Sequence, residues 1–493
     1  MKNLNLILGV ITVFTFFGCS SDFLESQPTE VVTDSKIAEI VKIKPEALNA
    51  ILSGIYTTMY TPGMGGTTSH DDFGQKGFDI YTDMLCSDMV LAGTNYGYYT
   101  AIVRYQSTVN FTDLNNYKPW RYYYRVIFSA NQIIEAFGGN DVIPENEEGK
   151  HILGQAKALR AYGYFYLAQL FQKGYNADEL ILPIYTDTKV PNQPKSAASK
   201  VYDLIIKDLT DSISLLETYN RDNKSSINKA VAQGLLAYTY GAQGNYQKVR
   251  DITSDIIAQN NFPLTTENQL VAKLDGTGKL TNPESGFNNV ATPSWMWGVD
   301  LTTATDLDLI SWWGQIDYYT YSYAYAGDPK TMDSGLQSKI TASDIRKGQF
   351  NSTGRPLGKF FDTNRVPGGQ RIITTDYVYM RIEEMYLLNA EAKAMLGDDL
   401  GAKTILKQLF AIRKVDSAYL DALSGTALQK EIYLQTRIEF WGEGKSYLAM
   451  KRNKATTTRG SNHLFMAGES FQYDDPRLTF VIPQAEVLNN PVL

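Results

Sequence analysis

A helical pattern that recurs in pairs constrains the fold of this chain more than any other feature. Residues 228–243 place small and apolar residues at helical spacing, a turn at Gly244 follows, and a second helical stretch ends before Pro263. Residues 377–413 repeat this order, with Gly397 at the corresponding turn. Because each helix of such a pair has an apolar face that it cannot bury alone, successive pairs are expected to stack.

Helical periodicity extends along much of the chain. The segments 152–171 and 199–217 are predicted to form a further pair, joined by an enlarged loop around Pro183. Single helices are predicted at 49–60, 117–137 and 427–452. The sequence therefore predicts a mainly α fold, built on a scaffold of helix pairs that resemble tetratricopeptide repeats.

Two segments depart from the helical pattern. Residues 61–116 and 264–376 are rich in Gly, Thr, Asn and aromatic residues, and their helical periodicity is weak. We interpret both as long excursions that form a loop-rich, irregular half of the molecule. Long loops on a rigid scaffold are where binding residues usually lie, so the ligand is expected on this half.

The N-terminus is typical of an exported lipoprotein. Lys2 is followed by the apolar run Leu6–Phe17, which is too short to cross a bilayer and has the length of a signal-peptide core. Gly18-Cys19 then resembles a bacterial lipobox, so residues 1–18 are predicted to be a signal peptide and Cys19 the lipidation site. The alternative is an ordinary secreted protein cleaved near Gly18. Residues 19–45 would form the lipidated N-terminus and a tether.

The composition argues against several classes of protein. The chain has 46 basic and 53 acidic side chains, so we expect no nucleic-acid partner. Three His far apart in the sequence and only two Cys argue against a His- or Cys-rich metal site and against a disulfide scaffold, and we expect no cofactor. Cys86 is interpreted as an inert buried thiol. The Asp residues between 71 and 88 lack EF-hand spacing, so no metal site is predicted, although calcium stays an open alternative.

Tyrosine is unusually abundant, with 33 Tyr against 21 Phe. Residues 295–325 contain nine Trp or Tyr and no Phe, and residues 95–99 add three more Tyr. Aromatic rings stack on the apolar faces of sugars, while Asn, Gln and Asp hydrogen-bond the hydroxyl groups. The candidate ligand-binding residues are therefore Asn95, Tyr96, Tyr98, Tyr99, Trp312, Trp313, Gln315, Asp317, Tyr318, Tyr319 and Tyr321. The competing interpretation is a buried core beneath a long loop, with the 95–99 segment only packing against it.

Catalytic motifs are scarce. The chain contains no G-x-S-x-G, no H-E-x-x-H, no P-loop and no dinucleotide-binding fingerprint. A pair of glycosidase carboxylates can come from any part of a chain, so a hydrolase stays an alternative. We expect a protein that is not an enzyme and name no catalytic residue.

Several segments taken together resemble the SusD/RagB-like family of outer-membrane lipoproteins. In chain order they are CSSDFLESQP, ALRAYGYFYLAQLFQ with LPIYTD, ASDIRKGQF with GKFF, DYVYMRIEEMYLLNAEAKAMLGD, RIEFWGEGKSYLAMKRN and FVIPQAEVLNNP. The chain departs from the family where Ala449-Met450 precede Lys451-Arg452, since an Asp often stands in that helix. The resemblance covers essentially the whole chain.

The resemblance implies about four tetratricopeptide-like helix pairs within one SusD-like domain over 46–493. It also implies a lipid-anchored protein at the cell surface, held to the outer membrane through Cys19. The expected function is capture of an oligosaccharide and its delivery to a SusC-like TonB-dependent transporter. The alternatives are a peptide-binding, RagB-like lid on the same type of transporter, or a surface glycoside hydrolase.

Overall fold

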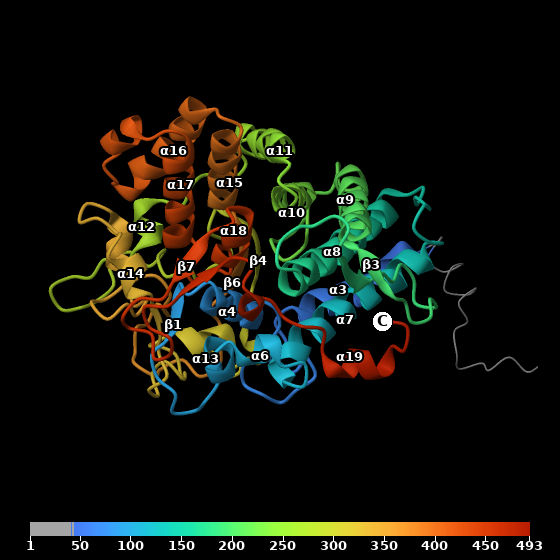
Figure 1. The fold of residues 1–493 in the computed structure, drawn as a ribbon, viewed down its shortest axis with the longest axis horizontal. Coiled ribbons are helices and arrows are strands. Elements are labelled where there is room, and N and C mark those ends of the chain that lie inside the picture. The colour runs from blue at the N-terminus through green and yellow to red at the C-terminus, as the bar shows by residue number, and fades with distance from the viewer. Residues whose placement is uncertain (1–40, 42–43) are drawn as a thin grey trace, which may run out of the picture.

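The computed structural model describes residue 41 and residues 44–493 (Figure 1). The predicted signal peptide, the predicted lipidation site Cys19 and nearly all of the predicted tether lie outside the described residues.

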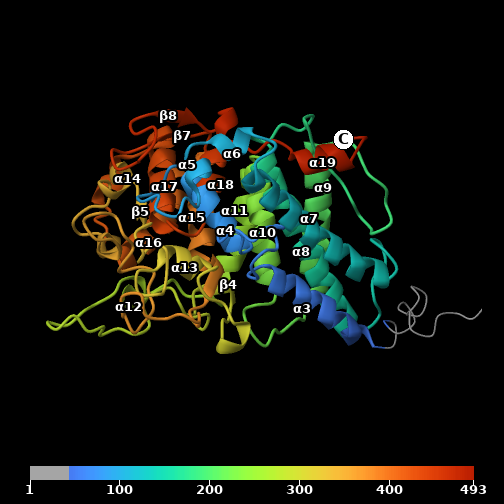
Figure 2. The same ribbon diagram turned by 90° about the horizontal axis from the view of Figure 1, so that it is seen from below.

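Long helices form one side of the molecule and pack in chain order (Figures 1 and 2). α8 packs against α9, and α10 packs against α11, which confirms two of the predicted helix pairs. The helices of this part are α3 (Asn49–Thr58), α7 (Leu114–Ala136), α8 (Glu147–Phe171), α9 (Ala198–Leu215), α10 (Lys229–Ala242) and α11 (Tyr246–Ala258).

The scaffold continues through the C-terminal helices. α15 packs against α11 and α16, which confirms the third predicted pair, and α17 contacts both α15 and α18. The fold is therefore mainly α and tetratricopeptide-like, as predicted. These helices are α15 (Ile382–Met395), α16 (Asp399–Arg413), α17 (Gly425–Glu439) and α18 (Ser446–Arg452).

The centre of the scaffold is α8, which is buried along nearly its whole length between α7 and α9. The side chain of Asn146 caps it by accepting a hydrogen bond from the Gly149 N–H at 2.7 Å. At Gly163 a β-carbon would lie 2.8 Å from Ile127 Cγ1, so glycine lets α7 approach closely. This packing explains why an Ala- and Gly-rich sequence forms a central helix.

The predicted helix over 427–452 is wrong as a single element. α17 ends at Glu439 and α18 begins at Ser446, because Gly442 and Gly444 adopt positive φ angles of 83° and 72° between them. The buried carboxylate of Asp83 accepts a hydrogen bond from the Gly442 N–H at 2.8 Å, which satisfies a buried backbone donor at this break.

The prediction of an irregular excursion over 61–116 is also partly wrong, because this segment contains a buried helix, α4 (Gln75–Leu85). Every residue of α4 is buried, and it contacts α18, α5 and β1. Its apolar residues Phe78, Tyr81 and Leu85 lie at helical spacing, while its polar residues are also buried, such as Lys76, which pairs with Asp79 at 2.8 Å. The Gly-, Thr- and Asn-rich composition of the whole segment concealed this short amphipathic pattern.

The other elements of the described residues are short. Their strands form four two-stranded antiparallel sheets, pairing β1 with β5, β2 with β3, β4 with β6 and β7 with β8, and the β2–β3 pair contacts α8 and α9 in the helical half. The strands are β1 (Met89–Leu91), β2 (Leu180–Pro183), β3 (Lys195–Ala197), β4 (Trp295–Val299), β5 (Lys330–Met332), β6 (Tyr377–Arg381), β7 (Thr456–Thr458) and β8 (Ser470–Gln472). The remaining helices are α5 (Thr100–Val103), α6 (Gln106–Val109), α12 (Glu267–Leu270), α13 (Trp312–Ile316), α14 (Ser334–Gln337) and α19 (Gln484–Asn489).

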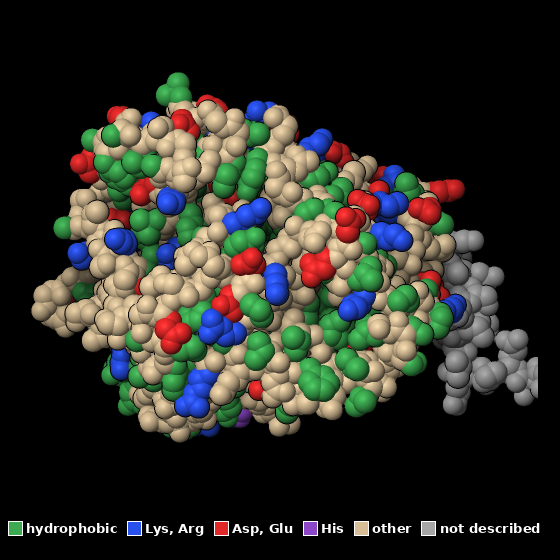
Figure 3. Space-filling model, in the orientation of Figure 1, with side chains coloured by type: hydrophobic (Ala, Val, Ile, Leu, Met, Phe, Trp, Pro, Cys, Tyr) green, Lys and Arg blue, Asp and Glu red, His purple; other side chains and the backbone are tan. Residues whose placement is uncertain are grey.

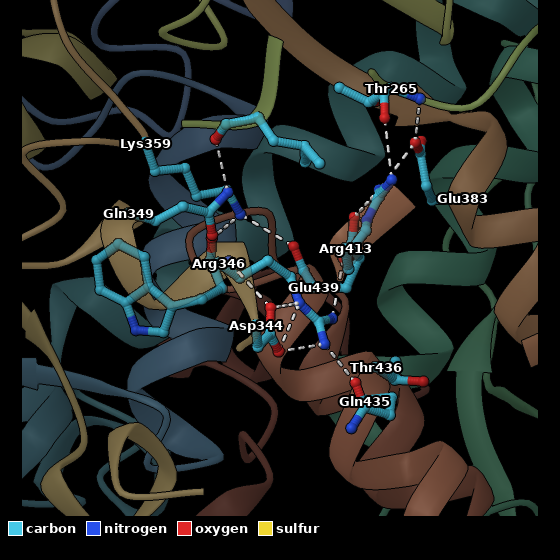
Figure 4. A network of polar contacts seen from close by, with 12 residues as sticks. Thr265, Asp344, Arg346, Gln349, Lys359, Glu383, Arg413, Gln435, Thr436 and Glu439 are labelled. Atoms are coloured by element: carbon cyan, nitrogen blue, oxygen red, sulfur yellow. Dashed lines mark hydrogen bonds and ion pairs between the residues drawn. The ribbon is translucent and has the colours of Figure 1, made fainter. Parts of the chain in front are cut away.

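A buried network of ion pairs fastens the 264–376 segment to the C-terminal helices (Figure 4). Glu439 of α17 lies at its centre and contacts the guanidinium groups of Arg346, Arg381 and Arg413 at 3.1, 2.8 and 2.5 Å. The network contains four acidic and four basic side chains, all almost fully buried: Asp344, Glu383, Glu439 and Glu443, with Arg346, Lys359, Arg381 and Arg413. Because the charges balance, none is left unpaired in the interior.

Candidate functional site

The two tyrosine-rich segments of the sequence lie side by side in the structure. The buried carboxylate of Asp328 accepts hydrogen bonds from the backbone N–H groups of Asn95 and Tyr96, at 2.6 and 2.9 Å. β1 and β5, which pair in an antiparallel sheet, place the start of one segment beside the end of the other. A strand pair and a carboxylate therefore hold together two loops more than 200 residues apart in the chain.

Tyr323 joins the aromatic side chains of both loops. Its ring makes edge contacts with Tyr96 and Tyr98, with ring centroids 4.8 and 5.0 Å apart. Its hydroxyl group hydrogen-bonds His70 Nδ1 at 2.6 Å, and the His70 ring stacks on Tyr98 at 5.5 Å. Tyr323 is itself buried, so it acts as a support for its more exposed neighbours.

A second group of rings continues from the same loop. Tyr318 makes edge contacts with Tyr319 and Tyr325 at 5.5 and 5.6 Å. The Arg365 guanidinium lies 4.3 Å from the centre of the Tyr319 ring and donates a hydrogen bond to its hydroxyl oxygen at 2.7 Å. These contacts fix the orientation of rings that would otherwise move freely on a loop.

We call the exposed and half-exposed members of these groups the tyrosine surface. The exposed fractions of Tyr96, Tyr321 and Tyr325 are 51%, 41% and 48%, and the other members are partly exposed. The tyrosine surface consists of Tyr96, Tyr98, Tyr318, Tyr319, Tyr321 and Tyr325. It offers several flat apolar faces, each with a polar hydroxyl group at its edge.

Three predicted ligand-binding rings are not available to a ligand. Trp312 and Trp313 are only 2% and 1% exposed, and Tyr99 is equally buried. Trp312 packs edge-on against Trp313 and Phe360, with centroids 5.0 and 4.6 Å away. The expectation that these tryptophans form an exposed platform is therefore wrong. Their large apolar area forms the core beneath the loop instead.

Gln315 and Asp317 are also buried and serve the loop itself, contrary to the prediction that they bind ligand hydroxyl groups. The Asp317 carboxylate accepts hydrogen bonds from the Thr320 hydroxyl at 2.6 Å and from the Asp362 N–H at 2.9 Å. The Tyr319 N–H also donates to this carboxylate at 2.9 Å, but burial outweighs these hydrogen bonds and raises the pKa of Asp317 to about 7. Gln315 accepts a hydrogen bond from Lys330 Nζ at 2.8 Å, and burial lowers the pKa of that amine to about 7.

The acidic residues between 71 and 88 are occupied by protein partners. Asp71 binds Lys118 at 2.6 Å, and Asp88 binds the Arg437 side chain at 2.8 Å. Within residue 41 and residues 44–493, no group of three or more His, Cys, Asp or Glu side chains is arranged to hold a metal ion. Cys86 is buried, and burial raises the pKa of its thiol well above the ordinary value, which keeps it protonated.

Sequence reasoning missed the residues that position the tyrosine surface. His70 and Asp328 support it from beneath, and Arg371 lies 4.7 Å from the centre of the exposed Tyr321 ring. Asp328 carried a usable signal, because it directly follows the Tyr-rich run in the turn sequence GDP. Nothing in the local sequence links His70 or Arg371 to these tyrosines.

The fold defines the class of protein: a tetratricopeptide-like scaffold with a loop-rich half. Residues 25–240 match a family model described as "Starch-binding associating with outer membrane", and residues 310–493 match the model of the SusD family. The chain therefore belongs to the SusD/RagB-like family. In the part of the chain that the structure describes, no helix has both the length and the apolar character needed to cross a membrane.

Two relatives come from Formosa agariphila. The SusD-like protein P25 is 23% identical over 294 residues, which is 59% of this chain and 51% of that protein, so the chain spans about half the length of this relative. The SusD-like protein P38 is 22% identical over 391 residues, covering 70% of this chain and 74% of that protein.

Solved structures share the fold over nearly the whole chain. A SusD superfamily protein from Bacteroides thetaiotaomicron gives a TM-score of 0.73 at 21% identity, covering 91% of this chain and 98% of that one. A SusD-like carbohydrate-binding protein from Bacteroides vulgatus gives 0.72 at 24% identity, with coverages of 91% and 96%. The surface glycan-binding protein A from Bacteroides uniformis gives 0.64 at 17% identity, with coverages of 91% and 98%.

Proposed function

We propose that this protein binds oligosaccharides at the cell surface and that the tyrosine surface is its binding site. The observation that carries the proposal is the meeting of two distant loops to expose several tyrosine rings, among them Tyr96 and Tyr321. A sugar ring stacks on an exposed aromatic face, and its hydroxyl groups hydrogen-bond polar atoms at the ring edge. The carbohydrate- and glycan-binding descriptions of related structures support the proposal.

The supporting residues beneath the surface favour binding in a second way. Asp328 fixes the backbone at Asn95 and Tyr96, and Arg371 packs on Tyr321. Rings that are already oriented lose less conformational entropy when a ligand arrives, so more of the contact energy appears as affinity.

The proposal extends to the setting of the protein. Lipidation at Cys19 would hold the protein at the outer membrane, and the "associating with outer membrane" description of the matched family agrees with this location. Captured oligosaccharide would then pass to a SusC-like TonB-dependent transporter. In this role the protein binds and releases its ligand without chemical change.

Affinity electrophoresis in gels that contain a polysaccharide tests the binding site. A panel of starch, β-glucan and host-type glycans first identifies the polysaccharide that retards the protein. The double variant Tyr96→Ala/Tyr321→Ala is then expected to lose most of this retardation while its thermal unfolding stays unchanged. Tyr419→Ala is the matched control, because Tyr419 is a similarly exposed tyrosine, 40% accessible, on a distant part of the scaffold.

Three results would contradict the proposal. Retardation that survives the double variant would place the binding site elsewhere. Binding of a peptide mixture in place of every glycan would favour the RagB-like alternative. Release of reducing sugar by the purified protein would show a glycoside hydrolase.

A further inference from the structure

A cavity of about 550 Å³ lies away from the tyrosine surface, between α7, the loop that follows β2, and α19. Both ribbon views place α7 near α19 (Figures 1 and 2). Hydrophobic side chains gather over this part of the molecule in Figure 3, and Phe128 at the cavity is 49% exposed. The volume lies within the range of roughly 300–1,000 Å³ that small-molecule sites occupy.

Hydrogen bonds hold the three walls in place. The indole N–H of Trp120 on α7 donates to the Glu486 carboxylate on α19 at 3.2 Å. The Tyr124 hydroxyl on α7 donates to the Pro183 carbonyl at 2.9 Å, at the start of the loop. The cavity is therefore formed before a ligand enters, which lowers the entropic cost of binding.

Two guanidinium groups distinguish the α7 wall. Arg121 and Arg125 are exposed, line the cavity and lie one helical turn apart, so they share a face of α7. Among residue 41 and residues 44–493, neither forms an ion pair; the Arg121 guanidinium donates a long, 3.5 Å hydrogen bond to the Tyr117 hydroxyl oxygen and lies 6.0 Å from the centre of that ring. Unpaired guanidinium groups at a cavity suit an anion, because their N–H groups bind carboxylate or sulfate oxygens in pairs.

The other walls carry hydrogen-bond acceptors. Glu486 lies on α19, and Asp187 on the loop accepts hydrogen bonds from the backbone N–H groups of Lys189 and Val190 at 2.8 and 2.9 Å. Each carboxylate oxygen has two lone pairs, so these groups can accept further hydrogen bonds from the hydroxyl groups of a ligand in addition to those from the protein. The cavity is therefore asymmetric, with cations on one wall, acceptors on the other two, and aromatic rings between them.

We propose that this cavity binds a saccharide unit that carries an anionic group, either a uronate carboxylate or a sulfate ester. The anion lies at Arg121 and Arg125, the sugar ring packs against Phe128, and hydroxyl groups donate to Asp187 or Glu486. This second site uses none of the residues of the tyrosine surface and adds a preference for charged glycans to the protein.

Ligand-observed NMR titration of the full chain tests the site with three probes of similar size. These are methyl β-D-glucuronide, D-glucose 6-sulfate and the neutral methyl β-D-glucoside. At least one charged probe is expected to bind about tenfold more tightly than the neutral probe, with an affinity that falls as salt rises. The two charged arms show whether the site takes the carboxylate or the sulfate. Equal binding of all three probes overturns the proposal.

Substituted variants show whether the charged probes bind in this cavity. Arg121→Gln/Arg125→Gln is expected to abolish the preference for charged probes. Lys248→Gln/Lys339→Gln removes the same charge from exposed positions outside the cavity and is expected to keep it. An unchanged preference in the arginine variant overturns the proposal. Loss of charged-probe binding in Tyr96→Ala also overturns it, because the probe would then bind the tyrosine surface; retention separates this site from the proposed function.

Discussion

The tyrosine surface lies on the loop-rich half and the buried ion network joins that half to the C-terminal helices, and the two use side chains in opposite ways. The tyrosine surface leaves its rings exposed or half-exposed, and their edge contacts run to one another and to the buried Tyr323. The network around Glu439 buries eight charged side chains and satisfies each with several partners. The comparison shows that an irregular segment can bury paired charges on its inner side while it presents oriented aromatic rings on its outer side.

The largest loss of folding stability is expected from Glu439→Ala. This change leaves the guanidinium groups of Arg346, Arg381 and Arg413 buried around an absent carboxylate. Breaking a buried ion cluster in this way costs about 3–5 kcal/mol. Urea unfolding should show a much lower midpoint. Asp421→Ala, which removes an exposed partner of Lys407, is the control and should change the midpoint little. Equal midpoints for the two variants would contradict a structural role for the network.

Trp312→Ala is expected to have the next largest effect, which is a loss of folding stability. Trp312 packs against Trp313 and Phe360 with almost no exposure, so truncation leaves a cavity in the core. Core Trp→Ala changes cost about 3–5 kcal/mol. Chemical unfolding measures this loss, and glycan retardation of the protein that remains folded should persist. Loss of retardation without loss of stability would show that the ring contacts ligand after all.

The stability contributions of Glu443, in the ion network, and of Asp317, in the loop that carries the tyrosine surface, are expected to change with pH in opposite directions. Burial opposes ionisation of Glu443, but Arg381 and Lys359 outweigh it and lower its pKa to about 2. Stability from Glu443 is therefore complete above about pH 4.5, its unfolded pKa, and is lost as the pH falls toward 2. Asp317, with its pKa raised by burial to about 7, favours the folded state while protonated, so its contribution declines as the pH rises from about 3.8 to 7.

Unfolding free energies measured from pH 2 to 8 test these signs. Glu443→Gln should flatten the acid limb of the curve, and Asp317→Asn should reduce the decline between pH 4 and 7. Because other groups also titrate, each variant is compared with the unmodified chain at every pH. An Asp317→Asn curve that runs parallel to the unmodified one would contradict the raised pKa.

The smallest effect, a modest loss of glycan binding, is expected from Arg371→Gln at the tyrosine surface. Arg371 lies 4.7 Å from the centre of the exposed Tyr321 ring, a contact worth about 0.5–1 kcal/mol. Its loss should weaken glycan binding two- to fivefold through a less ordered ring, with no change in thermal unfolding. Arg250→Gln, at a half-exposed arginine on α11, is the control for charge. A tenfold or larger loss would indicate that Arg371 contacts the ligand directly.

The sequence predicted the helical half well because each helix there shows its packing in its own residues. The pairs α8–α9, α10–α11 and α15–α16 all have long runs of helix-forming residues and turn residues that can be read locally. α4 was missed because it is short and lies in a segment rich in Gly, Thr and Asn, and because its polar face is buried against partners distant in the chain, such as Tyr123 for Gln75 and Gly442 for Asp83. The break between α17 and α18 was missed for a related reason, since Asp83 supports it from a distant segment.

The candidate site was predicted as two segments and only partly as residues. Composition located the tyrosine-rich loops correctly, and the structure brings them together through Tyr323 and Asp328. Composition did not distinguish the buried Trp312 from the exposed Tyr321, because both stand among aromatic neighbours in the same loop. Exposure depends on how the loop folds back on the scaffold, which no local pattern encodes.

The sequence by itself determined the paired-helix scaffold, the position of the loop-rich segments and the resemblance to the SusD/RagB-like family. These depend on periodicity and motifs, which are properties of neighbouring residues. Only the tertiary structure decided which aromatic rings face water and which charged residues form a buried network. The same holds for the arginine pair on α7, which faces a cavity only because α19 returns to that helix from the far end of the chain. These features depend on contacts between distant segments, and burial changes the energy of a ring or a charge far more than its sequence neighbours do.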